Sequence, residues 1–162
     1  MKRSYAVLFA FLLALAACRP TPTPEAETMT ITVYFQNEAR YAVGTEPYED
    51  AVSRIVPLSD DLPLTVLEWM FIGPTAGEEA QGLRVVRSGT TGFSQFTVQD
   101  GVAHVYLTGE CSSGGSTYTI ANLIFANLGQ FSTITAIKIY DQSGETETPD
   151  GPASSIPFCL EP

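Results

Sequence analysis

The side chains best suited to chemistry are one histidine and three cysteines among 162 residues. His104 is the only residue that could supply an imidazole as general base. Cys111 precedes a predicted helix, and a helix N-terminus lowers the pKa of a thiol. A cysteine hydrolase that uses Cys111 and His104 is therefore one hypothesis. In the other interpretation, His104 is a half-exposed strand residue between Val102 and Tyr106, and no residue is catalytic.

Two of the cysteines have a simpler use. Cys111 and Cys159 would remain as a pair in an exported protein, and a disulfide is the usual state there. Closing the loop between them would stabilise the fold by about 4 kcal/mol on the chain-entropy model. We therefore expect a disulfide that ties the C-terminal segment to the domain and leaves the hydrolase hypothesis without a nucleophile.

The third cysteine, Cys18, ends an N-terminal export signal. A short basic start precedes the apolar run Tyr5–Ala17, which is too short for a comfortable membrane-spanning helix. Leu15-Ala-Ala-Cys18 resembles the bacterial lipobox, which implies cleavage before Cys18 and lipid attachment to its thiol. The alternative is an ordinary secretory signal that happens to carry a cysteine. We expect a lipid-anchored protein on the outer side of the cell membrane.

Composition limits the partners. Lys2 and Arg3 leave with the signal, so six of the eight basic residues remain against 18 acidic residues, a net charge of −12. Such a chain repels phosphate backbones, which excludes nucleic acid as a partner. It also repels anionic headgroups, so we expect acyl chains rather than charge to hold the protein at the lipid bilayer.

Two helices are predicted as positioning elements. Ser59-Asp-Asp61 offers N-cap oxygens, Pro63 fits a first turn, and Gly73-Pro74 ends the first helix. The second helix is expected from a cap at Ser116 to about Leu128. Each helix has an apolar stripe that needs a partner surface.

Strands are predicted where apolar and polar residues alternate. Thr30–Gln36 is the clearest case. Asp100-Gly101 separates two further alternating runs and predicts a hairpin, because a type I′ turn needs positive φ at both central residues. The remaining strands are expected at Ala51–Val56, Gly82–Val86, Phe93–Gln99, Val102–Leu107 and Ile134–Tyr140.

The order strand, strand, helix, hairpin, helix, strand predicts an α+β fold. The simplest burial of every apolar face is a two-layer domain, one mostly antiparallel sheet with two helices packed on one face. We expect a signal peptide at 1–17, a lipidated cysteine and Pro/Thr tether at 18–28, and the folded domain at 29–143. Residues 144–162 would be an acidic, Pro-rich tail pinned by the disulfide.

Other groups give weaker signals. Trp69 in the first helix and Tyr106 in the hairpin are candidate interface aromatics, although Trp69 equally fits a core position. Asp141–Glu147 carries acidic and hydroxyl residues at alternate positions, like a calcium loop. Thr146 and Pro152 stand where that loop needs its glycine and its bidentate glutamate. We expect neither a metal nor a cofactor.

Three segments resemble the GerMN domain, the sporulation and spore germination domain of bacterial lipoproteins. Leu67-Glu-Trp-Met-Phe-Ile-Gly-Pro74 is similar to its helix-ending LL-x-GP pattern, and Phe96–Leu107 is similar to its V-x-DG-x-A-x-V-x-L hairpin. Ala121–Phe131 followed by Ile134–Tyr140 is similar to its last helix and strand. The resemblance covers about Met29–Gly144. It implies a small module, related to ring-building domains, that acts through protein contacts without known catalytic residues.

These observations predict a membrane-anchored envelope lipoprotein that is not an enzyme. Its GerMN-like domain would act as a protein-binding or assembly module, linked to sporulation, germination or envelope maintenance, with an envelope protein as partner. The cysteine hydrolase stays open as an alternative. A peptidoglycan- or glycan-binding module is a third hypothesis, for which Tyr34, Tyr41 and Tyr48 are the aromatic candidates.

Overall fold

The structure is a computed structural model that describes residues 27–162. The predicted signal peptide, the predicted lipidation site at Cys18 and most of the predicted tether lie outside the described residues. Within residues 27–162, no helix has the length and apolar character needed to cross a membrane.

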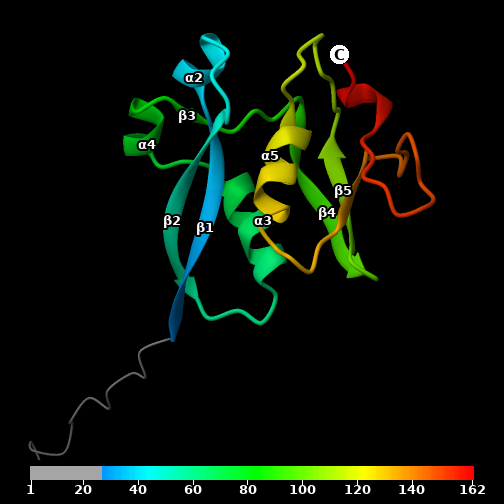
Figure 1. Ribbon diagram of the computed structural model, residues 1–162, viewed down its shortest axis with the longest axis horizontal. Coiled ribbons are helices and arrows are strands. Elements are labelled where there is room, and N and C mark those ends of the chain that lie inside the picture. Colours follow the sequence, from blue (N-terminus) through cyan, green and yellow to red (C-terminus); the bar gives the residue numbers. More distant parts are fainter. Residues whose placement is uncertain (1–26) are drawn as a thin grey trace, which may run out of the picture.

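The first sheet has the strand order β2-β1-β3 (Figure 1). β1 (Thr28–Asn37) runs antiparallel to β2 (Glu49–Pro57) along nearly its whole length. β3 (Leu83–Arg84) pairs only with the last two residues of β1. β1 buries alternate residues from Ile31 to Phe35, as a strand with one face on the core must. The first two predicted strands are confirmed, and the third is shorter than expected.

The second sheet has the strand order β4-β5-β6. β4 (Thr90–Gln99) and β5 (Val102–Gly109) form the predicted antiparallel hairpin. Asp100 and Gly101 have φ values of 50° and 80°, which are the positive values that the short turn requires. β6 (Ala136–Tyr140) pairs with β5 in parallel, so the chain must cross over between them.

The first long helix forms where the sequence predicts it. α3 (Leu62–Ile72) begins after Asp61, whose carboxylate accepts the Leu64 N–H at 3.0 Å. It ends at Gly73, whose φ of 100° a residue with a Cβ rarely adopts.

The second long helix begins later than predicted. α5 (Ile120–Leu128) starts after Thr119, where a capping box closes through Asn122 Oδ1 and the Thr119 N–H at 2.8 Å. Ser116, the expected cap, instead accepts the Tyr118 N–H at 3.1 Å in the preceding loop. The reciprocal pair of bonds at Thr119 outcompetes the single hydroxyl at Ser116.

Three short helices interrupt loops that the sequence left without structure. They are α2 (Glu38–Ala42), α4 (Ala76–Ala80) and the 3₁₀ helix η2 (Phe158–Leu160). α4 begins with a capping box between Thr75 and Glu78. Helices this short depend on such caps and on tertiary contacts rather than on periodicity.

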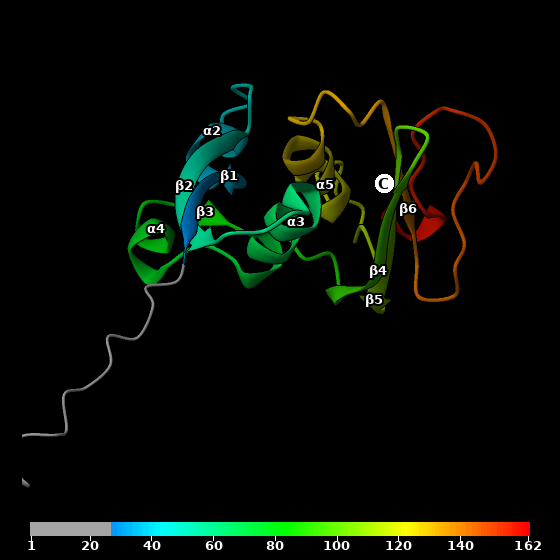
Figure 2. The ribbon, with the colours of Figure 1, turned by 90° about the horizontal axis from the view of Figure 1, so that it is seen from below.

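The elements form three layers, with α3 and α5 between the two sheets (Figure 2). The α+β class is confirmed, but the expected single sheet is replaced by two sheets, each of which packs on one side of the helices. The physical reason lies in the helices. α3 carries only Thr65 and Glu68 as polar residues, so it is apolar around most of its circumference and needs cover on both sides.

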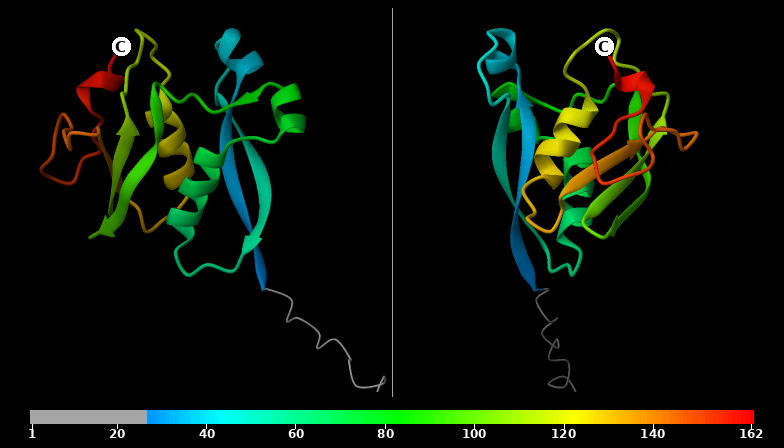
Figure 3. Two further views of the ribbon diagram at one scale, coloured as in Figure 1. Left: turned by 180° about the vertical axis from the view of Figure 1, so that it is seen from behind. Right: turned by 45° about the vertical axis from the view of Figure 1, so that its right-hand side comes forward.

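The C-terminal segment, residues 141–162, packs on the outer side of the second sheet, away from the helices (Figure 3). Ser155 forms a parallel bridge beside β6, with its N–H donating to Ile137 O at 3.0 Å and its carbonyl accepting from Ile139 N at 2.9 Å. Leu160 is 1% exposed. The segment therefore contacts the domain at several points, among them Thr146, Ser155 and Leu160, and not only at the cysteine.

Candidate functional site

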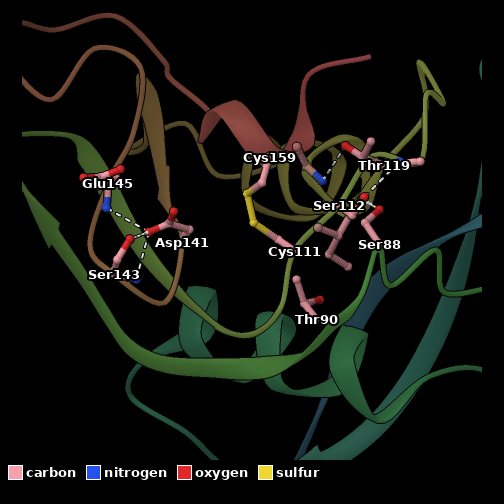
Figure 4. Close-up of a disulfide and its surroundings, with 12 residues drawn as sticks. Ser88, Thr90, Cys111, Ser112, Thr119, Asp141, Ser143, Glu145 and Cys159 are labelled. Atoms are coloured by element: carbon pink, nitrogen blue, oxygen red, sulfur yellow. Dashed lines mark hydrogen bonds between the residues drawn. A yellow bond between two sulfur atoms is a disulfide. The ribbon is translucent and has the colours of Figure 1, made fainter.

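Cys111 and Cys159 are joined by a disulfide with Cα atoms 5.7 Å apart (Figure 4). Two backbone hydrogen bonds next to Cys111 hold the same region together. Ser113 N donates to Cys159 O at 2.7 Å, and Ser112 N donates to Ser88 O at 2.8 Å. The bond joins the loop after β5 to η2, and in this form the hydrolase hypothesis has no nucleophile.

His104 lies in the middle of β5, on the face turned away from the helices. Its Nδ1 is 3.0 Å from the Tyr140 hydroxyl, and the two rings stack with centroids 5.9 Å apart. Tyr106 stacks on the same Tyr140 ring at 4.4 Å. Burial raises the pKa of Tyr140, and the neighbouring Tyr106 and Asp150 add to this rise. The three rings stack across β5 and β6, which gives His104 a structural role in this pair of strands.

The two predicted interface aromatics are both half-buried. Trp69 packs against the core from α3. Tyr106 has one ring face covered by Tyr140. Their role at an interface stays a prediction.

A second aromatic group was not predicted as a unit. Tyr41 from α2, Tyr48 before β2 and Tyr118 before α5 meet with ring centroids 5.4 to 6.0 Å apart, and we call them the tyrosine cluster. Tyr34, which the sequence placed with the first two, lies instead within β1. The missing member, Tyr118, is 70 residues beyond Tyr48, so no local spacing could have revealed it.

The tyrosine cluster has one buried member that is held by a hydrogen bond and one exposed member. Tyr118 is 3% exposed, and its hydroxyl donates to Glu49 Oε1 at 2.5 Å. Burial, followed by this hydrogen bond to a carboxylate, raises the pKa of Tyr118 well above its usual range. Tyr41 is 37% exposed, and Val43, two residues further on, is 75% exposed. The cluster therefore combines a buried, hydrogen-bonded tyrosine, Tyr118, with the exposed side chains of Tyr41 and Val43.

Hydrogen bonds and an ion pair hold α2, the helix that carries Tyr41, in place. Asn37 Oδ1 accepts the Arg40 N–H at 3.1 Å, and Asn37 Nδ2 donates to Asp50 at 2.6 Å. Arg40 forms an ion pair with the same Asp50. α2 follows the last residue of β1, so the tyrosine cluster lies at the opposite end of that strand from Thr28 (Figure 1).

Acidic side chains outnumber basic ones in the described part of the chain. Residues 27–162 contain 17 acidic and five basic side chains, and all five basic ones are already engaged within the domain. Three are in ion pairs, Arg40 with Asp50, Arg54 with Glu78 and Arg84 with Glu38. The other two, Arg87 and Lys138, donate to backbone carbonyls. The carboxylates left over give the domain a negative field.

The acidic loop that resembled a calcium site is a turn. The Asp141 carboxylate accepts from Ser143 N at 2.9 Å, Ser143 Oγ at 2.7 Å and Glu145 N at 3.0 Å (Figure 4). Burial raises the pKa of Asp141, the hydrogen bonds from Glu145 and Ser143 lower it, and the net shift is downward. No group of three or more metal-binding side chains converges among residues 27–162.

Comparison with known proteins gives a matching family model and a similar solved structure. The model of the Germane family, described as sporulation and spore germination, matches residues 32–146. Among solved structures, the tandem GerMN domains of the sporulation protein GerM from Bacillus subtilis match at a TM-score of 0.46 and 17% identity. That match covers 80% of this chain and 46% of the other, so this chain spans about half of its length. No curated protein matches.

Proposed function

The chain belongs to the Germane family of sporulation and spore germination, and on that premise we propose that it is a lipid-anchored envelope protein that binds another protein through the tyrosine cluster. It works as an assembly or binding module and not as an enzyme. Cys18 carries the anchor, and residues 18–28 hold the domain away from the membrane.

The tyrosine cluster is the observation that carries this proposal. Binding hot spots are enriched in tyrosine and sit on rigid, well-packed supports, because little side-chain entropy is then lost on binding. Tyr118 and Glu49 supply the support, and Tyr41 with Val43 supplies the exposed contact. β1 has ten residues and separates this end from Thr28 by about 30 Å, at 3.3 Å per residue. The cluster therefore lies at the end of the domain that is far from the proposed N-terminal anchor.

The negative charge of the domain favours a partner with a basic contact surface. Because every described basic side chain is engaged internally, the free surface charge is negative. A partner with a basic contact surface would be steered towards it and would lose association rate in high salt. We therefore propose a basic envelope protein.

Peptidoglycan is the less favoured ligand. Sugars stack on the open faces of aromatic rings, but Tyr41 and Tyr48 pack edge to face with an interplanar angle of 87°. Tyr118 covers a further part of both rings. Much of the ring surface in the cluster is therefore covered by the neighbouring tyrosines and is not open for a sugar to stack on.

Site-specific photo-crosslinking in the native cell tests the proposal. A photoreactive residue at Val43 should crosslink to a basic envelope protein, and Tyr41→Ala should reduce that crosslink at least fivefold. Ile72 is the matched control, since it is 66% exposed and lies at the end of α3. Equal crosslinking from both positions, or crosslinks to glycan alone, would contradict protein binding at the cluster.

The anchor has a separate test. Cys18→Ala should move the protein from the membrane fraction to the soluble extracytoplasmic fraction. Unchanged membrane partitioning would refute the lipid anchor and leave the crosslinking result intact.

A further inference from the structure

β1 has one fully paired edge and one partly open edge. β2 pairs with it from Thr28 to Gln36, whereas β3 covers only Gln36 and Asn37 on the other side. Closer to the start of β1, two side chains bond this edge in place of a strand: Asn127 in α5 and Gln130 just after it. Asn127 bonds both backbone groups of Tyr34, and Gln130 donates to Thr32 O at 3.2 Å. Nearer the start of β1, no element of the described chain pairs with this edge.

The direction of the free groups follows from the ladder. Tyr34 uses both its N–H and its C=O towards α5, so its pair with Ala51 is a non-hydrogen-bonded one. Hydrogen-bonded and non-hydrogen-bonded pairs alternate along an antiparallel ladder. Thr32 and Thr30, two and four residues earlier, therefore also point their N–H and C=O groups at this edge. Since Gln130 already donates to the Thr32 C=O, the groups left for a partner are the Thr32 N–H and both backbone groups of Thr30.

A hollow of about 220 Å³ lies against this edge. Its apolar lining comes from β1, from the start of α3 and from the loop after α5. The lining consists of Met29, Ile31, Leu62, Val66 and Phe131, with Thr30, Thr32 and Gln130 as the polar members. Backbone donors and acceptors beside an apolar recess are what an added β-strand needs, since the backbone gives affinity and the recess takes a side chain.

The segments that contribute lining residues to the hollow carry acidic but no basic charge. These segments, 27–32, 58–66 and 127–135, contain Glu27, Asp60 and Asp61 but no lysine or arginine. Arg54, which pairs with Ile31 across β1 and β2, is already engaged in an ion pair with Glu78. A second copy of this chain would bring its own negative surface to the site, which opposes edge-to-edge pairing. A basic strand is favoured instead.

We propose that the open edge of β1, from Met29 to Thr32, accepts an extended basic peptide of a partner protein as an additional strand. An apolar side chain of the peptide fills the recess formed by Leu62, Val66 and Phe131. Lysine or arginine residues at its ends lie near the three carboxylates. This surface lies at the opposite end of β1 from the tyrosine cluster, so it is a second contact site.

Peptide titration of the full chain tests the proposal. The probe is a ten-residue peptide of alternating threonine and valine with lysine at both ends, and binding is followed by amide NMR shifts. The Thr30 and Thr32 amides should shift saturably, and their hydrogen exchange should slow. A copy N-methylated at alternate amides on its pairing edge, and a copy with glutamate ends, should each bind at least tenfold more weakly. Equal binding of the N-methylated copy would overturn strand addition.

A backbone variant provides the second test. Thr30→Pro removes an N–H that the β1–β2 ladder does not use, so the domain should stay folded by circular dichroism while peptide binding falls at least tenfold. Thr30→Val keeps the N–H and should bind like the parent. Undiminished binding by Thr30→Pro, or concentration-dependent dimers through this edge in sedimentation, would overturn the proposal. Tyr41→Ala should leave peptide binding unchanged, which separates this site from the tyrosine cluster.

Discussion

The side-chain amide of Asn127 hydrogen-bonds both backbone groups of Tyr34. Asn127 Oδ1 accepts the Tyr34 N–H at 2.9 Å, and Asn127 Nδ2 donates to the Tyr34 C=O at 2.9 Å. The same Nδ2 donates to Leu123 O within α5. Asn127 is fully buried, so this helix residue satisfies β1 in the way that a neighbouring strand would.

Asn127→Leu should therefore be strongly destabilising. The substitution keeps the number and branching of the side-chain heavy atoms but leaves the Tyr34 N–H and C=O without these partners, at about 1–3 kcal/mol for each unsatisfied group. We expect a loss of about 2–6 kcal/mol in the free energy of unfolding, measured by urea denaturation. Gln130→Ala removes an exposed bond to the same strand and should cost less than about 1 kcal/mol. Equal losses for the two variants would show that the Asn127 bonds are not special.

Loss of the disulfide should weaken the fold without abolishing the C-terminal packing. Cys111→Ser with Cys159→Ser opens a loop with a sequence separation of 48, which corresponds to about 4 kcal/mol on the chain-entropy model. Ser155 and Leu160 should remain protected in hydrogen exchange. The Ser155 N–H donates to Ile137 O in β6, the Leu160 N–H donates to Pro157 O, and both residues are buried, none of which requires the sulfur atoms. Finding two free thiols by mass measurement of the exported protein without reductant would contradict the disulfide itself.

Acid should destabilise the domain through Glu78. The Arg54 guanidinium bonds both Glu78 oxygens, at 2.7 and 2.5 Å, and lowers the pKa of that carboxylate from 4.5 to about 2. A lowered folded-state pKa gives stability that is present above pH 4.5 and is lost as pH falls towards 2. The contribution is at most about 3 kcal/mol, at 1.36 kcal/mol per pKa unit.

Glu78→Gln provides the comparison for that pH dependence. The variant should be less stable than the parent at pH 6 and should lose less stability between pH 5 and pH 2. Urea unfolding at each pH measures the difference. Parallel pH profiles for parent and variant would mean that another carboxylate controls the acid transition.

Gly89→Ala should be among the most damaging glycine substitutions. Gly89 has a φ of 76°, and a Cβ there would lie 2.0 Å from the Glu110 carbonyl oxygen, which is backbone and cannot move aside cheaply. Strain in the left-handed region costs about 1–2 kcal/mol, and overpacking adds about 1–3 kcal/mol. Gly114 has a φ of 59° with open space around it, so Gly114→Ala should show the conformational cost alone. Similar unfolding midpoints for the two variants would contradict the clash.

The sequence predicted the elements that depend on local pattern. The Asp100-Gly101 hairpin, the caps and stops of α3 and the alternation in β1 all lie within a few neighbouring residues, where backbone preferences act directly. The disulfide partners were paired by counting the cysteines that remained after export. The start of α5 was misplaced because Ser116 and Thr119 are both good caps, and only the capping box with Asn122 distinguishes them.

The tertiary structure decided which surfaces meet. Apolar periodicity shows that α3 and α5 must be covered, but it does not say whether one sheet or two covers them. The residues that fix the answer are far apart in sequence, such as Asn127 and Tyr34 at a separation of 93. The tyrosine cluster and the open edge of β1 arise in the same way. Both exist only after chain segments without any local pairing preference have been brought together by burial, because the hydrophobic effect is non-directional and leaves the choice of neighbour to packing and hydrogen bonding.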